Sequence, residues 1–256
     1  MKAGIDLNCD MGESFGPWKM GNDLAILDYV TSANIACGFH AGDPLTMQGV
    51  VKAALDRGVE VGAHPGLQDL VGFGRRAMQV TPAEAYALIV YQVGALSGFA
   101  AALGGRLNHV KAHGALYNMA AKDRALADAI AAAIRDVDPG LVMFALAGSE
   151  LIGAAQRAGL QCASEVFGDR TYQDDGSLSP RSLPGAMIED AEVAAAQVKR
   201  MVMEGVVRSQ QGREVPVKAD TLCIHGDQAG ALAFVRRIRE QLAASGIEVR
   251  APARAT

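Results

Sequence analysis

The five histidines of this chain lie at the ends of short apolar segments. His40, His64, His113 and His225 come at or just after such a segment, and His109 lies in the segment that ends near His113. Imidazoles suit general acid–base catalysis and metal binding because their pKa lies near neutrality. A single histidine is more often a hydrogen-bonded structural residue. Five at equivalent positions instead favour a shared functional cluster.

Carboxylates occur at the same kind of position. Asp10 and Glu13 follow the first apolar segment beside flexible glycines, and Glu165 lies at the end of a later segment. Together with imidazoles, carboxylates can move protons during bond cleavage. Asp10, His64 and His113 could also form a carboxylate-plus-imidazole metal site. Their spacing is not diagnostic, so the sequence leaves the presence of a metal open.

A cationic, glycine-rich segment covers residues 72–76, Gly72-Phe73-Gly74-Arg75-Arg76. Backbone N–H groups and guanidinium groups in such a segment can hold an anion. An ordinary surface loop with two solvated arginines is the alternative. Arg170 follows another apolar segment together with Asp169. No GxxxxGK[ST] motif occurs, so a nucleotide would have to bind without a P-loop.

These residues are predicted to be positioned by alternating strands and helices. The apolar runs predict strands at 5–9, 34–37, 59–63, 107–112, 141–145, 161–166 and 221–224. Amphipathic patterns predict helices at 22–31, 44–56, 81–103, 122–135, 149–158, 188–204 and 228–244. Thr81, Pro82 and Glu84 form a capping-box signature for the long third helix. Seven β-α units in a row favour a parallel (β/α) barrel of seven strands, with an open doubly wound sheet as the alternative.

Strand parity predicts a polar interior. Because side chains alternate between the two faces of a strand, polar groups share one face in three strands: Asp6, Asn8 and Asp10; Glu60 and His64; His109, Lys111 and His113. Unpartnered polar groups inside a barrel cost free energy. A solvent-reachable funnel at the carboxyl ends of the strands, where α/β enzymes build active sites, explains them. The wholly apolar strand at 141–145 is predicted to be structural.

Composition limits the cellular setting. The chain has 256 residues, a net charge of -4 and no uniformly basic stretch, which argues against nucleic acid or an anionic membrane as partner. The N-terminus lacks the apolar core of a signal peptide, and apolar runs such as 141–147 are too short to span a bilayer. Four cysteines without CxxC spacing favour free thiols in the cytoplasm. Without a linker or composition shift, we expect residues 1–256 to form one domain.

Short distinctive motifs are spread along nearly the whole chain. They are IDLNCDMGESFG at 5–16, NIACGFHAGDP at 34–44, GAHPG at 62–66, GFGRR at 72–76, HVKAHGALY at 109–117, FGDRTY at 167–172, DG at 175–176, Arg181, PGA at 184–186 and IHGD at 224–227. In this combination they resemble the LamB/YcsF family, the A subunits of 5-oxoprolinase. Gly168 departs from the alanine expected there but touches no candidate catalytic group.

The resemblance implies a barrel related to polysaccharide deacetylases and a bacterial enzyme with two further subunits, B and C. It implies cleavage of 5-oxoproline to L-glutamate, coupled to hydrolysis of ATP with Mg²⁺. No nucleic acid or membrane partner is expected, and homo-oligomerisation stays open.

Given that chemistry, each candidate residue has an expected role. Catalysis is assigned to Asp10, His64, His113 and Glu165 as acid–base groups and to Lys111 as a stabiliser of negative charge. Phosphate binding is assigned to Arg75, Arg76 and Arg170. Substrate binding is assigned to Asn8, Asn34 and His40, with His225 and Asp227 at the rim. Two alternatives are a stand-alone metal-dependent deacetylase or amidohydrolase and a non-catalytic subunit that only binds 5-oxoproline.

Overall fold

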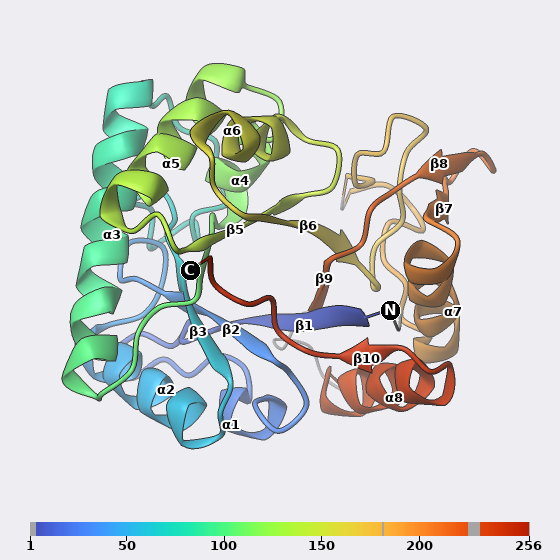
Figure 1. Ribbon diagram of the computed structural model, residues 1–256, viewed down its shortest axis with the longest axis horizontal. Helices are drawn as coiled ribbons and strands as arrows, with labels where there is room; N and C mark the ends of the chain where they lie inside the picture. Colours follow the sequence, from blue (N-terminus) through green and yellow to red (C-terminus); the bar gives the residue numbers. More distant parts are fainter. Residues whose placement is uncertain (1–3, 181, 225–230, 256) are drawn as a thin grey trace.

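A closed barrel of parallel strands forms the centre of the molecule (Figure 1). The computed structural model describes residues 4–180, 182–224 and 231–255. The barrel strands, in order around it, are β1 (Gly4–Met11), β2 (Ser32–Ala36), β3 (Glu60–His64), β4 (His109–Lys111), β5 (Val142–Leu146), β6 (Cys162–Phe167) and β9 (Thr221–Ile224). The barrel closes because β9 pairs with both β6 and β1. The predicted seven-stranded barrel is therefore confirmed, and the open-sheet alternative is wrong.

Helices cover the outside of the barrel (Figure 1). They are α1 (Asp23–Ile26), α2 (Pro44–Asp56), α3 (Pro82–Ala102), α4 (Gly114–Ala120), α5 (Arg124–Val137), α6 (Glu150–Ala158), α7 (Ala191–Met203) and α8 (Ala231–Ala244). Between α7 and β9 a hairpin is formed by β7 (Val206–Arg208) and β8 (Glu214–Pro216). A short strand near the C-terminus, β10 (Glu248–Val249), pairs with the start of β1.

Two helices differ from the prediction. The helix expected at 22–31 ends at Ile26, and Thr31 pairs with Leu7 of β1 directly before β2 begins. The Thr31 N–H donates to the Leu7 carbonyl at 2.9 Å, and the Thr31 hydroxyl accepts from the Leu7 N–H at 2.9 Å. Helix α4 was not predicted. It follows β4 directly at His113, which makes no side-chain cap, so the usual start signal is missing.

Helix α3 corrects the expectation that every apolar stretch is too short to span a bilayer. Among the described helices it alone has the length and apolar composition for this. It packs against α2, β3 and α5. The buried Gln92 on α3 exchanges two hydrogen bonds of 2.9 Å with the backbone of Gly66, and the predicted capping box at Thr81 is present. These contacts make α3 an outer helix of the barrel.

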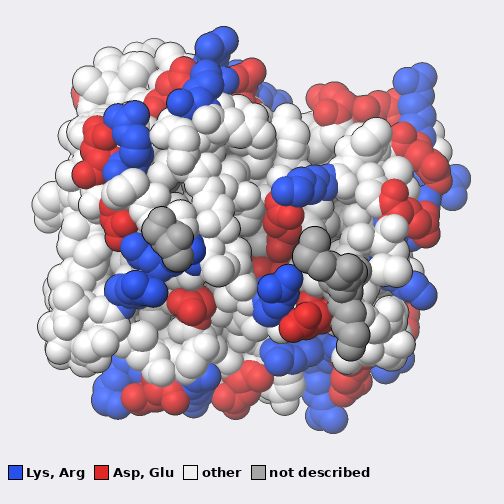
Figure 2. Space-filling model, in the orientation of Figure 1, with Lys and Arg blue, Asp and Glu red and all other residues white. Residues whose placement is uncertain are grey.

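Stability comes mainly from the apolar layer between strands and helices. The outward-facing residues of β1, namely Ile5, Leu7 and Cys9, pack there and are almost fully buried. On the outer surface acidic and basic side chains lie next to one another along the rim in Figure 2. Such exposed pairs, for example Arg157–Asp128 at 2.6 Å, contribute only about 0–1 kcal/mol each.

The inward-facing residues form layers of different polarity. At the amino end the Asp6 carboxylate accepts hydrogen bonds from Thr31, Ser32 and Thr221, and burial raises the pKa of Asp6 to about 6. A small apolar cluster of Val142, Phe144 and Ala163 fills one side of the interior. The prediction that β5 is structural agrees with this placement. The charged groups lie nearer the carboxyl ends of the strands.

Candidate active site

Lys111 is the centre of the polar interior. Its Nζ lies 2.9 Å from Asp10 Oδ1 and 2.8 Å from Glu165 Oε1, and it also donates to Asn8 Oδ1 at 3.2 Å and Cys223 Sγ at 3.1 Å. Burial lowers the pKa of Lys111, but Asp10, Cys223 and Glu165 outweigh burial and raise it well above the ordinary value. The ammonium is therefore a fixed positive charge between two carboxylates.

Two asparagines below this ion pair hold Asp10 and Lys111 in place. Asn34 Nδ2 donates to Asn8 Oδ1 at 2.7 Å and to Asp10 Oδ1 at 2.8 Å. His109 Nε2 donates in turn to Asn34 Oδ1 at 2.8 Å. Asn8 and Asn34 are fully buried. The structure thus places these predicted substrate ligands underneath the charged pair, where they orient other groups.

Glu165, predicted to be an acid–base group, is also fully buried. Its Oε2 accepts a hydrogen bond from the Tyr117 hydroxyl at 2.6 Å, and its Oε1 accepts one from Asn8 Nδ2 at 3.1 Å. Burial, followed by the charge of Glu165, raises the pKa of Tyr117 well above its ordinary value, so the phenol stays protonated. Both carboxylate oxygens of Glu165 are committed, which suits a counter-ion for Lys111.

His64 and His113 meet at the carboxyl ends of β3 and β4. His64 Nδ1 lies 2.8 Å from the Lys111 carbonyl oxygen, and His113 Nε2 lies 2.8 Å from the Phe73 carbonyl oxygen. The remaining nitrogens, His64 Nε2 and His113 Nδ1, are 3.0 Å apart. Asp10 Oδ2 lies 3.3 Å from His64 Nε2. Burial, then the neighbouring His64, lowers the pKa of His113 to about 3.

His40 and Glu13 complete this cluster. The His40 ring stacks on His113 at a centroid distance of 3.7 Å, and His40 Nε2 lies 3.4 Å from Glu13 Oε1. His40 is 1% exposed, and burial lowers its pKa well below the ordinary value. One ligand atom from each of Glu13, His40, His64 and His113 lies within 4.8 Å of all the others, so these residues could hold a metal ion.

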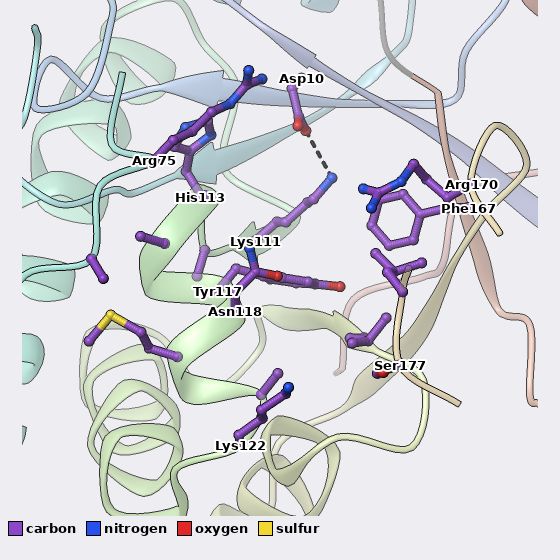
Figure 3. Close-up of a pocket in the computed structure, with 18 of the residues that line it drawn as sticks. Asp10, Arg75, Lys111, His113, Tyr117, Asn118, Lys122, Phe167, Arg170 and Ser177 are labelled. Carbon is purple, nitrogen blue, oxygen red and sulfur yellow. Dashed lines mark hydrogen bonds and ion pairs between the residues drawn. The ribbon is translucent and has the colours of Figure 1, made fainter. Parts of the chain in front are cut away.

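A cavity of about 650 Å³ opens above the Lys111–Asp10 pair. In Figure 3 Arg75 and His113 lie on one side of this pair, and Phe167 and Arg170 lie on the other. The described lining includes Arg75 and Arg170 but not Arg76. The Arg76 guanidinium is instead bound to Asp69. The cavity therefore combines fixed cations with carboxylates at its base.

Apart from Arg76, which binds Asp69, the sequence-predicted residues divide into three groups. Asp10, Lys111, His64, His113, Arg75 and Arg170 line the cavity. Asn8, Asn34, Glu165 and His40 lie directly behind it and contact the lining residues. His225 and Asp227 fall outside the described residues, so their predicted place at the rim stays a prediction.

Buried His109 gives the first testable effect. Burial, then Lys111 and His64, lowers its pKa to about 3. Below pH 6.5 the unfolded chain binds a proton at this residue that the folded chain does not bind until about pH 3. Stability therefore falls as the pH falls through this window. In His109→Gln we expect that loss to be shallower by a slope that approaches about 1.4 kcal/mol per pH unit below pH 6.

Urea unfolding of the wild type and His109→Gln between pH 7 and 5 measures this difference. Gln is chosen because its side-chain amide can donate to Asn34 as His109 does. Equal slopes for the two proteins would show that folded His109 titrates normally.

Comparison with known proteins now identifies the family. The model of the LamB/YcsF family matches residues 5–256. The chain belongs to the LamB/YcsF family. Among its relatives, the A subunit of 5-oxoprolinase from Bordetella parapertussis is 65% identical over 251 residues, which cover 98% of this chain and 100% of that protein. The A subunit of 5-oxoprolinase from Bacillus subtilis is 64% identical over 247 residues, covering 96% of both.

Solved structures show the same fold. The lactam utilization protein from Thermus thermophilus superposes with a TM-score of 0.92 at 50% identity, covering 97% of this chain and 100% of that one. A family 4 carbohydrate esterase from Streptomyces lividans superposes with a TM-score of 0.50 at 15% identity, covering 99% and 97%. The esterase shares the barrel fold, as the sequence motifs implied.

Two residues of this LamB/YcsF chain were not predicted as site residues. Glu13 joins the histidines because it lies on the loop after β1, three residues beyond Asp10. Tyr117 reaches Glu165 because α4 places it one helical turn after His113. The sequence pattern placed Glu13 at a strand end, but no role was assigned to it. Tyr117 could not be found in this way, because the helix that carries it was not predicted.

Proposed function

We propose that this chain is the A component of an ATP-dependent 5-oxoprolinase and hydrolyses the lactam of 5-oxoproline to L-glutamate together with subunits B and C. The observation that carries the proposal is the 65% identity, over nearly the full length, to the A subunit of 5-oxoprolinase from Bordetella parapertussis. The strand-end cavity supplies the charged groups that such a reaction needs. A single domain and a cytoplasmic location, consistent with four free cysteines, belong to the same proposal.

The substrate explains why ATP is needed. A lactam is a resonance-stabilised amide and therefore a poor electrophile. Transfer of a phosphoryl group from ATP to the lactam oxygen gives an imidate-like species that water can attack. This chemistry requires cations for phosphate and a group that takes a proton from water and returns one to the departing nitrogen.

Asp10 is our candidate for that proton transfer. Its Oδ1 is held by Lys111 and Asn34, while its Oδ2 points to the histidine side of the cavity. The carboxylate can accept a proton from the attacking water and then return it to the ring nitrogen as the C–N bond breaks, which leaves an acyl phosphate. A second water hydrolyses this acyl phosphate to L-glutamate and phosphate. Lys111 can stabilise the negative charge that develops at the reaction centre. His64 and His113 stay candidate groups of the same reaction centre.

Arg75 and Arg170 are our candidates for phosphate binding, with Mg²⁺ expected to accompany ATP. Both line the cavity, and Arg170 is anchored by a hydrogen bond to the Ser179 carbonyl. Arg75 lies over the Phe73 ring at 4.9 Å, which orients its guanidinium. Arg76 is committed to Asp69 at a separate place, so we do not extend the phosphate role to it.

Phosphate release tests the proposed function. The chain alone and the chain mixed with subunits B and C are supplied with ATP, Mg²⁺ and 5-oxoproline. We expect release of phosphate and glutamate that depends on 5-oxoproline and requires all three subunits. Omission of 5-oxoproline is the control for uncoupled ATP hydrolysis.

Other outcomes point to the two alternatives. Cleavage of amides or acetyl groups by the chain alone, without ATP and sensitive to chelators, would support a stand-alone metal-dependent hydrolase. Full turnover of the complex with an Asp10→Ala chain that still binds 5-oxoproline would support a non-catalytic binding subunit.

A further inference from the structure

Four side chains from the ends of four successive strands converge at one side of the cavity. Glu13 follows β1, His40 follows β2, His64 ends β3 and His113 follows β4. We call these four residues the histidine–glutamate cluster. The histidines are each no more than 4% exposed, so water does not freely solvate their ring nitrogens.

Hydrogen bonds fix which nitrogens face the centre of the cluster. A carbonyl oxygen only accepts, so His64 Nδ1 must carry the hydrogen that it gives to the Lys111 carbonyl. His113 Nε2 likewise carries the hydrogen given to the Phe73 carbonyl. In the neutral rings, His64 Nε2 and His113 Nδ1 are therefore both lone-pair nitrogens. They face each other at 3.0 Å, where neither can donate to the other.

His40 adds an independent observation. Both of its ring nitrogens are buried and make no hydrogen bond to the described residues. A proton shared by His64 and His113 would leave these nitrogens unsatisfied. Buried polar atoms normally have a partner. A cation at the centre would instead provide one for all three imidazoles at once.

We propose that the histidine–glutamate cluster binds a divalent transition-metal ion of the Zn²⁺ type. Imidazole nitrogen and carboxylate oxygen are suitable Zn²⁺ ligands, and bond lengths of about 2.0–2.2 Å place tetrahedral ligand atoms about 3.3–3.6 Å apart. The separations here are 3.0 Å for His64–His113, 3.4 Å for His40–Glu13 and 3.7 Å for His113–Glu13. The other pairs of ligand atoms lie within 4.8 Å of one another, so shifts of up to about 1 Å bring all four into a ligand sphere.

The surroundings are built to orient these ligands. Metal-binding histidines usually donate their second N–H to a carbonyl or carboxylate, as His64 and His113 do. Gly74 has a φ of +61°, and a Cβ there would lie 2.7 Å from His40 Cβ and 2.9 Å from His113 Cδ2. A glycine at this position lets the loop close over both rings.

The proposed ligand set differs from the one suggested by the sequence. Asp10 Oδ1 is bound to Lys111 and Asn34, which leaves Asp10 beside the ion as a reacting group. Glu13 takes its place as the carboxylate, and His40 is added. His64 and His113 then bind the ion and do not transfer protons themselves. The proposal concerns binding alone, so it stands or falls independently of the 5-oxoprolinase assay.

Metal binding by the purified chain tests the proposal. The chain, prepared without a polyhistidine tag, is stripped with chelator and titrated with Zn²⁺, or with Co²⁺ as a visible-absorption probe. We expect one ion per chain. Glu13→Gln and His40→Gln should weaken binding by at least the roughly 10–100-fold that is typical of losing an outer-shell partner. His109→Gln, which removes a buried histidine outside the cluster, is the matched control and should bind as the wild type does.

Thermal unfolding provides a second measurement that does not depend on the variants folding. An ion that binds the folded chain raises the melting temperature of the stripped wild type. Absence of this rise at saturating Zn²⁺ and Co²⁺, or equal affinity in the wild type and both cluster variants, overturns the proposal.

Discussion

Replacing Lys111 with methionine is expected to lower the free energy of unfolding by about 3–5 kcal/mol. Lys111 is 3% exposed and lies between the carboxylates of Asp10 and Glu165. Methionine fills a similar volume but leaves the fully buried Glu165 without its cation. Removing one member of a buried ion pair lowers the free energy of unfolding by far more than the intact pair contributes to it, because the other member stays buried as an uncompensated charge.

Urea unfolding followed by circular dichroism measures this loss. Lys52→Met is a matched control, because Lys52 pairs with Asp56 at 2.6 Å on the exposed face of α2 and should contribute only about 0–1 kcal/mol. Lys111→Met combined with Glu165→Gln should recover part of the stability, since the stranded charge is removed. A Lys111→Met loss no larger than that of Lys52→Met would mean that the variant does not leave an uncompensated charge at Glu165.

The barrel could be predicted from the sequence because its pattern is local. Each strand is a short apolar run. Helices such as α2 and α3 begin at an N-cap residue that can be read from the sequence, Asp43 for α2 and Thr81 for α3. Parity also predicted that Asn8, Asp10, His109 and Lys111 face the interior, since a period of two admits only two choices.

The positions of individual groups within the site could not be predicted in this way. Glu165 contacts Lys111 because β6 and β4 pair with opposite sides of β5. This contact joins segments that are far apart in the sequence, so a local pattern cannot predict it. Arg75 and Arg76 are neighbours in sequence, yet one lines the cavity and the other binds Asp69. The path of the loop decides this, and nothing in the local pattern specifies it.

Replacing Asp10 with alanine is expected to reduce turnover by about 10²–10⁴-fold, the range typical of a general acid–base group. The fold should change little, because the Asp10 side chain is 18% exposed at the base of the cavity and Lys111 keeps Glu165, Asn8 and Cys223 as partners. We expect a melting temperature within a few degrees of the wild type. The sequence alone predicts the same for His113, but His113 is bound to Phe73 and stacked on His40, so its removal also disturbs packing.

The control for Asp10→Ala is a variant that should lose stability but keep its turnover. Asp190 caps α7 by accepting from the N–H groups of Glu192 and Val193 and does not belong to the described cavity lining. Asp190→Ala should cost about 0.5–2 kcal/mol of stability and leave turnover per folded molecule unchanged. Steady-state kinetics of the three-subunit mixture and thermal unfolding of the isolated chain give both quantities for both variants. If Asp10→Ala loses stability as Asp190→Ala does while its folded fraction turns over normally, the carboxylate is structural, and the proton must be moved by another group of the cavity.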